Sequence, residues 1–201
     1  YNKARWALQP KDWLRFRMGG DVATDASDAS ATLLADVDGA WSTQLINALG
    51  LRVDWLAPVQ PAHALAGEMN TKAARELGLP HGIPLVVGAG DTAAAALGGG
   101  LLHDGDAQLT IGTGGQIVVM RAQRPPYEAS LNTFHGAAPQ PFAQWYVMAA
   151  MLNVGSALEW VLELLGYDWA AAYEAATQAS PDGVMFLPYL AGERTPLMDA
   201  H

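Results

Sequence analysis

The chain has 201 residues, of which 51% are hydrophobic and 15% charged, a composition typical of one or two globular domains and unlike that of disordered proteins. Its net charge of -9 at pH 7 argues against non-specific nucleic-acid binding, which depends on a basic surface. The lack of cysteine excludes disulfides and thiol chemistry, and no apolar run approaches the roughly 20 residues of a membrane-spanning helix.

Residues 13–18 are a short amphipathic piece, and the next segment, 19–36, carries acids and small residues before an apolar helix-like run. The third and fourth segments, 41–51 and 70–79, are expected to be helices. Ser27 or Asp28 is the expected N-cap of the second segment, because a side-chain oxygen there can bond the free amides of a helix start. Gly50 and Gly78 are expected to close the third and fourth, since glycine readily takes the left-handed conformation at helix ends. The Pro-rich residues 56–68 are expected to be an irregular connection.

Strand-like and helix-like segments alternate in the rest of the chain. The expected strands are 84–90, two strands within 104–120, the first residues of 145–166, and 184–190. The expected helices are 91–100, the remainder of 145–166, and 168–180, which Asp168 can cap. Residues 121–143 are expected to form a long loop. This alternation favours an α/β architecture.

The stretch LVVGAGDTAAAALGGG, residues 85–100, places one acid, Asp91, between an apolar strand and a helix start. The glycines before it allow a substrate to approach the backbone closely. A carboxylate placed there can accept a hydroxyl proton as a general base. The second interpretation is structural, because Asp is also a preferred N-cap, worth about 1 kcal/mol. The motif alone leaves both roles open.

The stretch TIGTGG joins two expected strands by the turn Gly112-Thr113-Gly114-Gly115. Successive amides in such a turn can converge into a nest that binds phosphate oxygens. The plainer interpretation is an ordinary glycine hairpin turn. We expect Gly114 and Gly115 to need φ angles that a β-branched residue avoids.

Five aspartates lie close together early in the chain: Asp21, Asp25, Asp28, Asp36 and Asp38. They lack the spacing of a calcium-binding EF-hand loop. We expect them to form a solvated acidic face.

Glycines also suggest where the chain divides. The triplet in GGGLLH is costly inside a helix, at about 1 kcal/mol for each glycine, so we place a domain boundary near 98–103. The final stretch, FLPYLAGERTPLMDAH, looks like part of an ordered segment. The chain is therefore expected to be a piece of a longer protein.

Five motifs occur in the order and at the spacing of one known family: PKDWLRFRMGG, SDAS, VVGAGDTAAAALGGG, GDAQLTIGTGG and FLPYLAGERTP. In these the chain resembles the FGGY carbohydrate kinases, and within them the xylulokinase-like members. The resemblance implies a two-domain α/β fold of the actin and hexokinase type (ribonuclease-H-like), incomplete here. Residues 1–100 would be the C-terminal part of the first, sugar-binding domain. Residues 101–201 would be the N-terminal part of the second, nucleotide-binding domain.

The resemblance also implies site residues. Asp91 would take the proton of the attacking sugar hydroxyl, and Asp91 and Thr92 would contact the sugar. The residues implied to bind the nucleotide are Gly112, Thr113, Gly114, Gly115, Gly155 and Glu159. No residue is implied to hold a metal. Two positions depart from the family: Thr92 stands where many xylulokinases have Asn, and Gly114 where many relatives have Ser.

The implied activity is ATP-dependent phosphorylation of a sugar hydroxyl, first of all D-xylulose to D-xylulose 5-phosphate, with ATP and Mg²⁺ as cofactors. The alternatives are a kinase of another sugar, polyol or sugar acid in the same family, and a non-catalytic α/β binding module. The implied partners are a small-molecule sugar and ATP, without nucleic acid or membrane. The resemblance also implies a cytoplasmic protein and allows a homodimer. The family's first phosphate loop, DxGT, is not in this sequence, so we expect the chain alone to be nearly inactive.

Overall fold

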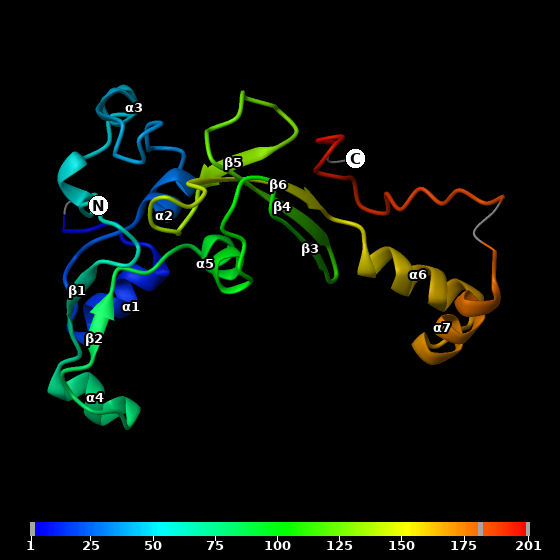
Figure 1. Cartoon of the computed structure of the whole chain (residues 1–201), viewed down its shortest axis with the longest axis horizontal. Coiled ribbons are helices and arrows are strands. Elements are labelled where there is room, and N and C mark those ends of the chain that lie inside the picture. Colours follow the sequence, from blue (N-terminus) through cyan, green and yellow to red (C-terminus); the bar gives the residue numbers. More distant parts are fainter. Residues whose placement is uncertain (1–2, 181–182, 200–201) are drawn as a thin grey trace. The chain divides into compact units, whose positions relative to one another are not determined.

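A computed structural model describes residues 3–180 and 183–199, which form two compact units (Figure 1). Of the described residues, the first unit comprises those up to 106, with 119–126 and 133–147, and the second comprises 107–118, 127–132 and those from 148 onward. These units interleave along the chain, whereas the predicted domains follow it in order. The boundary near 98–103 therefore stays a prediction.

Helix α1 (Pro10–Met18) opens the first unit. It starts with a proline, whose missing N–H would have no partner at a helix start. It ends at Gly19, which has a φ of 112° in the left-handed region. Although the helix is short, two of its charged side chains, Asp12 and Arg15, are buried. Charged side chains are rarely buried unless they are paired. Asp12 and Arg15 therefore require partners inside the protein.

Helix α2 (Ala26–Ala31) is capped by Asp25, whose Oδ2 accepts a hydrogen bond from the Ser27 amide at 2.8 Å. The expected cap, Ser27 or Asp28, is wrong because the helix begins earlier than its apolar periodicity indicates. The expected solvated acidic face is also wrong for Asp25, which is only 1% exposed. Asp28 is half-buried, and the other three aspartates are exposed as expected.

Two further helices follow the sequence pattern closely. Helix α3 (Thr43–Ala48) ends just before Leu49, and Gly50 then takes a positive φ of 62°. Helix α4 (Thr71–Leu77) ends at Gly78 with a φ of 69°, as predicted. A short 3-10 turn, η1 (Val53–Trp55), lies between them in the chain.

Strand β1 (Leu65–Glu68) pairs antiparallel with β2 (Pro84–Val86), with a register irregularity between them (Figure 1). Strand β1 lies in the stretch expected to be irregular, and β2 covers the start of segment 84–90, which was expected to be a strand running into a glycine turn. Two clusters of buried side chains include residues from this pair: Ala23, Ala66 and Val87 in one, and Met69, Ala73, Ala74 and Leu85 in the other. This core fixes the chain just before the GAGD stretch.

The second sheet has four strands in the order β3-β4-β6-β5. In chain order their bounds are Ala107–Ile111, Gly115–Arg121, Asn132–His135 and Trp145–Met151. Strands β3 and β4 flank the GTGG turn, and β6 starts where it was predicted. Strand β5 lies in the stretch 121–143 that was expected to be a loop. Its four residues form a strand because β6 supplies hydrogen-bonding partners, which the local sequence does not reveal.

The chain continues with α6 (Gly155–Leu165) and α7 (Trp169–Gln178). The predicted cap of α7 is confirmed, since Asp168 Oδ1 accepts a hydrogen bond from the Ala171 amide at 2.8 Å. The strand predicted over 184–190 is wrong, because these residues form neither strand nor helix. Val184 is 88% exposed. Although this stretch is apolar, it pairs with no strand among the described residues.

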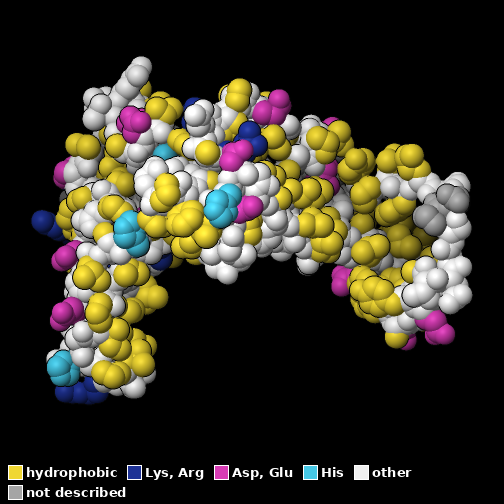
Figure 2. All heavy atoms as spheres, in the orientation of Figure 1, with side chains coloured by type: hydrophobic (Ala, Val, Ile, Leu, Met, Phe, Trp, Pro, Cys, Tyr) yellow, Lys and Arg dark blue, Asp and Glu magenta, His cyan; other side chains and the backbone are white. Residues whose placement is uncertain are grey.

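Within the described residues, no helix is long and apolar enough to cross a bilayer. The face drawn in Figure 2 shows few Lys and Arg side chains, and they are set apart from one another.

Candidate active site

Asp91 is the first residue of helix α5 (Asp91–Gly98), and its side chain is exposed. The N-cap is Gly90, so the interpretation of Asp91 as the cap is wrong. Asp91 Oδ1 accepts hydrogen bonds from the Thr92 amide at 2.6 Å and from Thr92 Oγ1 at 3.3 Å. Among the described residues, Oδ2 has no hydrogen-bond partner and the carboxylate has no Lys or Arg partner. One carboxylate oxygen is thus held by the helix start while the other remains open.

The loop before Asp91 is anchored to helix α2. The Gly90 amide donates a hydrogen bond to Ser27 Oγ at 2.9 Å. Ser27 in turn bonds Asp25 Oδ2 through its amide at 2.8 Å and its hydroxyl at 2.5 Å. A Cβ on Gly90 would lie 3.0 Å from Asp28 Oδ1. Glycine at this position therefore allows the loop to approach the helix closely.

Lys11 lies among three carboxylates. Its Nζ is 2.7 Å from Asp12 Oδ1, 3.0 Å from Asp25 Oδ1 and 3.0 Å from Asp28 Oδ2. Burial opposes the charge of Lys11, but these partners outweigh it and raise the pKa of Lys11 above its usual value. Burial also raises the pKa of Asp28, and Lys11 offsets part of that rise. The lysine thus neutralises a cluster that would otherwise repel itself.

Arg15 fixes the end of strand β2 on the same cluster. Its guanidinium lies 3.0 Å from Asp12 Oδ1 and donates to the carbonyl oxygens of Val87 and Ala23. Arg15 is only 5% exposed, and Asp12 only 1%. A buried ion pair with these additional hydrogen bonds fixes geometry, because each partner left alone would be strongly unfavourable.

Tyr146, on strand β6, is a further group near Asp91. It is only 5% exposed. Burial, and then the carboxylates of Asp91, Asp28 and Asp25, raise the pKa of Tyr146 well above its usual value. Its phenol therefore stays protonated across the physiological range.

Six residues of this surrounding network carried no predicted role in the site: Lys11, Asp12, Arg15, Asp25, Ser27 and Asp28. The available signal was the charge pattern of PKDWLRF, which contains both signs of charge, together with the acid of SDAS. Sequence spacing alone does not bring them to the GAGD loop, since the contacts span more than 60 residues, as for Ser27 and Gly90.

In the second unit, the GTGG turn is tied to the start of helix α6. The Gly112 amide bonds the Gly114 carbonyl at 2.9 Å, and the Gly155 amide bonds the Gly112 carbonyl at 2.9 Å. The Ser156 amide bonds the Thr113 carbonyl at 3.1 Å. The turn is thus held through its carbonyl groups by amides of the helix start.

Two glycines of this turn, Gly114 and Gly115, leave no space for a Cβ. None of Gly112, Gly114 and Gly115 has a positive φ, so the expected φ requirement is wrong. A Cβ on Gly114 would lie 2.6 Å from the Met151 carbonyl oxygen, and one on Gly115 would lie 2.7 Å from a side-chain carbon. A Cβ on Gly155 would lie 2.4 Å from a carbonyl oxygen of the turn. Close backbone packing therefore explains Gly114 and Gly155, and contact with a side chain explains Gly115.

The structure brings the four turn residues together with Gly155, the first residue of α6. Thr113 is exposed, and within the described part of the chain its amide and that of Gly114 donate no hydrogen bond. Glu159 is exposed one helical turn further along α6. Asp91 and Thr92 belong to the first unit and the GTGG turn to the second.

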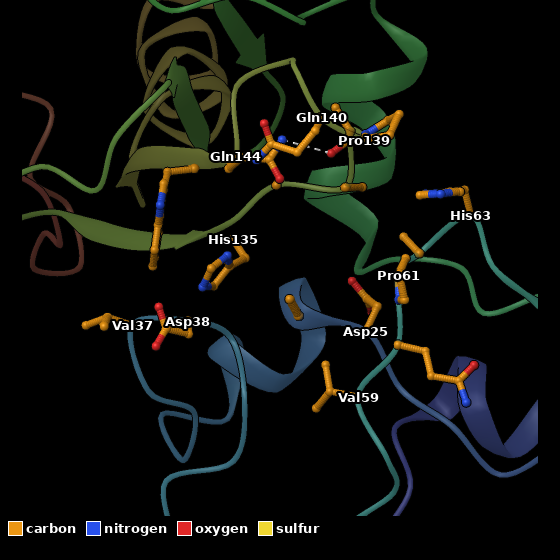
Figure 3. A pocket seen from close by; sticks show the side chains of 17 residues that line it. Asp25, Val37, Asp38, Val59, Pro61, His63, His135, Pro139, Gln140 and Gln144 are labelled. Carbon is orange, nitrogen blue, oxygen red and sulfur yellow. Dashed lines mark hydrogen bonds between the residues drawn. The ribbon is translucent and has the colours of Figure 1, made fainter.

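The first unit also contains a cavity of 570 Å³ (Figure 3). Asp25 and Asp38 line one side, and His135 and Gln144 line another. The His135 ring lies 3.8 Å from the Trp145 ring, and burial lowers the pKa of His135 below its usual value. None of the predicted site residues lines this cavity.

The family model described as "FGGY family of carbohydrate kinases, N-terminal domain" matches residues 1–98. The chain is 37% identical to the xylulose kinase of Escherichia coli strain K12 over 94% of its own length. It is also 37% identical to the autoinducer-2 kinase of Yersinia pestis over 66% of its length. These alignments cover 39% and 25% of the two relatives, so the chain spans well under half of each.

A crystal structure of a xyloylose kinase from Brucella ovis is also similar. It matches 98% of this chain with a TM-score of 0.84 and 32% sequence identity. The chain covers 41% of that structure. The similarity therefore extends over both units of the chain.

Proposed function

Because the chain belongs to the FGGY family of carbohydrate kinases, we propose that it carries the catalytic base and a phosphate-binding turn of an ATP-dependent sugar kinase. Its fold is the expected α/β fold of the actin and hexokinase type, of which it holds about two fifths. The proposed sugar is D-xylulose and the product D-xylulose 5-phosphate, in line with the name of the xylulose kinase relative.

The observation that carries the proposal is the placement of Asp91. Its carboxylate is exposed, has one oxygen held by Thr92 and one open, and follows a loop anchored by Ser27. General-base catalysis requires such an oriented carboxylate with a free oxygen. A carboxylate that served only to cap a helix would stand one residue earlier, at Gly90.

Asp91 Oδ2 is the oxygen that would accept the hydroxyl proton. As the proton leaves, the sugar oxygen forms its bond to the γ-phosphorus of ATP. The bond from that phosphorus to the β,γ-bridging oxygen breaks, which gives ADP and the sugar phosphate, with the proton on Asp91. In this type of transfer, positioning and charge stabilisation contribute more than covalent chemistry.

The GTGG turn supports a phosphate-binding role. Within the described residues the amides of Thr113 and Gly114 donate no hydrogen bond, while the carbonyl groups of Gly112 and Thr113 accept from the start of α6. An adjacent pair of free amides suits phosphate oxygens. Gly155 supports the turn from the helix start, and we propose that Glu159 lies along the nucleotide.

Mg²⁺ is expected to arrive with ATP. The described residues contain no group of three or more His, Asp or Glu side chains that could hold a metal ion. When bound, the ion supplies positive charge to the transferred phosphoryl group.

Thr92 bears on the choice of sugar. It borders the proposed base and donates to it through both its amide and its hydroxyl. The hydroxyl can instead bond a sugar, which makes Thr92 a candidate specificity residue. The similarity to an autoinducer-2 kinase as well as to a xylulose kinase makes a substrate panel necessary.

The test is a coupled assay of ADP formation by the full-length enzyme that carries this chain. D-xylulose is compared with D-ribulose, glycerol, xylitol, gluconate and autoinducer-2, each with ATP and Mg²⁺. D-xylulose is expected to give the highest kcat/KM. A higher kcat/KM with another member of the panel would change the proposed substrate but leave the proposed kinase activity in place. If none of these compounds supports ADP formation, the proposed kinase activity is overturned and the non-catalytic binding module is favoured.

A further inference from the structure

We infer that Lys11 and Ser27 are positioning residues that orient Asp91 through the GAGD loop; this rests on the proposed role of Asp91 as base. Neither residue is expected to touch the substrate. Ser27 holds the Gly90 amide next to Asp91. Lys11 holds the carboxylates that fix Ser27 and border Gly90.

The loop needs outside support because its own residues are small. Residues 88–90 are Gly-Ala-Gly, and Gly88 has a φ of 81°. Glycine has the greatest backbone freedom of any residue, so such a loop has little intrinsic preference for one conformation. A base that must meet a hydroxyl within hydrogen-bond distance therefore depends on contacts from other segments.

Ser27 supplies the direct contact. Its hydroxyl accepts from the Gly90 amide at 2.9 Å and donates to Asp25 Oδ2 at 2.5 Å. Both Ser27 and Asp25 are nearly fully buried, at 2% and 1% exposed. A buried hydroxyl with both partners in place has a defined orientation. This fixes the residue directly before Asp91.

Lys11 supplies the charge that allows this arrangement. Asp12, Asp25 and Asp28 all lie within 3.0 Å of its Nζ, and Arg15 pairs with Asp12. The Lys11 stem also runs beneath the loop, since its Cδ lies 3.6 Å from where a Cβ on Gly88 would be. Without the ammonium, three carboxylates would share one cation, and like charges at such distances repel strongly. Repulsion would move Asp28 and Asp25, and with them Ser27 and Gly90.

The experiment uses the full-length enzyme that carries this chain, with the variants Ser27→Ala, Lys11→Met and Lys11→Arg. The matched control is Ser30→Ala, because Ser30 lies on the same helix but bonds the Ser27 carbonyl and the His135 amide instead of the loop. The two readouts are the steady-state constants with the preferred sugar and ATP, and hydrogen exchange of the Gly90 amide by NMR.

Ser27→Ala and Lys11→Met are expected to lower kcat about 10- to 100-fold, as a misplaced catalytic group does, with KM for ATP within about twofold. Gly90 exchange should become at least about tenfold faster in Ser27→Ala. Lys11→Arg should recover most of the kcat lost in Lys11→Met, and Ser30→Ala should leave both readouts near wild type.

The inference is overturned if Gly90 exchange and kcat are unchanged in Ser27→Ala, or if Lys11→Arg is as impaired as Lys11→Met while both stay folded. The Gly90 exchange measurement distinguishes a failure of this inference from a failure of the proposed function. An enzyme inactive with every sugar would refute the kinase, and Gly90 exchange would still decide whether Ser27 holds the loop.

Discussion

The hydroxyl of Ser27 accepts a hydrogen bond from the amide of Gly90 at 2.9 Å, although 63 residues separate them in the chain. This bond joins the start of helix α2 to the residue before Asp91. Because Asp25 holds Ser27 and Lys11 holds Asp25, the exposed carboxylate stands on a buried polar network. The surface position of Asp91 thus depends on Ser27 and Asp25, which are themselves buried.

Replacing Asp91 by Asn in the full-length enzyme should lower kcat by about 10²–10⁴, the usual worth of a general base. The amide keeps the shape and the hydrogen bond to Thr92 but cannot take the proton. Stability should change little, because Gly90 and not Asp91 is the N-cap. Steady-state kinetics and thermal unfolding measure the two effects. Asp168→Asn, at the exposed cap of α7, is the matched control, and near-normal turnover of Asp91→Asn would remove Asp91 from the mechanism.

Replacing Gly114 by Ala should weaken nucleotide binding at least about tenfold. The added Cβ would lie 2.6 Å from the Met151 carbonyl oxygen, so the backbone of the turn must move, at a cost of roughly 1–3 kcal/mol. Titration calorimetry with ADP and Mg²⁺ measures the loss, and a parallel titration with D-xylulose should change much less. Equal weakening of both ligands would indicate general unfolding, and unchanged ADP binding would make the turn an ordinary hairpin.

Gly98 and Gly100 form a matched pair for testing backbone strain. A Cβ on either would meet nothing within 4 Å, but only Gly100 has a positive φ, of 77°. Gly98→Ala, at the last residue of α5, should therefore stabilise by about 0.5–1 kcal/mol. Gly100→Ala should destabilise by about 1 kcal/mol, the penalty of the left-handed conformation. Urea unfolding measures the change in unfolding free energy of each variant. Equal changes would show that φ does not decide the effect of the substitution.

Glu193 should make stability depend on pH. Burial alone would raise the pKa of its carboxyl, but hydrogen bonds from the Leu152 and Arg194 amides, at 2.6 and 2.8 Å, outweigh it and leave the pKa below its usual value. A lowered folded-state pKa adds stability above the unfolded value, about 4.3, and this is lost as the pH falls through the folded value.

Glu193→Gln should therefore be less stable than wild type at pH 7, by roughly 1–3 kcal/mol. The gap should narrow as the pH falls below about 4. Urea unfolding between pH 3 and 7 is the measurement, with Glu163→Gln on the exposed face of α6 as control. A gap that stays constant across this range would show that the carboxylate charge is not responsible.

The sequence by itself determined the elements whose signals are local. Caps and left-handed glycines placed the ends of α4 and α7, at Gly78 and Asp168. The change from apolar run to glycine to alanine-rich helix placed Asp91 at the start of α5, and the two strands around TIGTGG followed from their alternation and turn. Each of these depends on residues within a few positions of one another.

Only the tertiary structure decided what depends on distant partners. Strands β1 and β5 exist because β2 and β6 pair with them, and 184–190 forms no strand because no described strand pairs with it. Asp25 was expected in solvent but is buried, since Lys11 compensates its charge. Space, not φ, requires Gly114, because the Met151 carbonyl lies against it. Pairing, charge compensation and close packing all join residues far apart in the chain, and periodicity and propensity carry no information about such contacts.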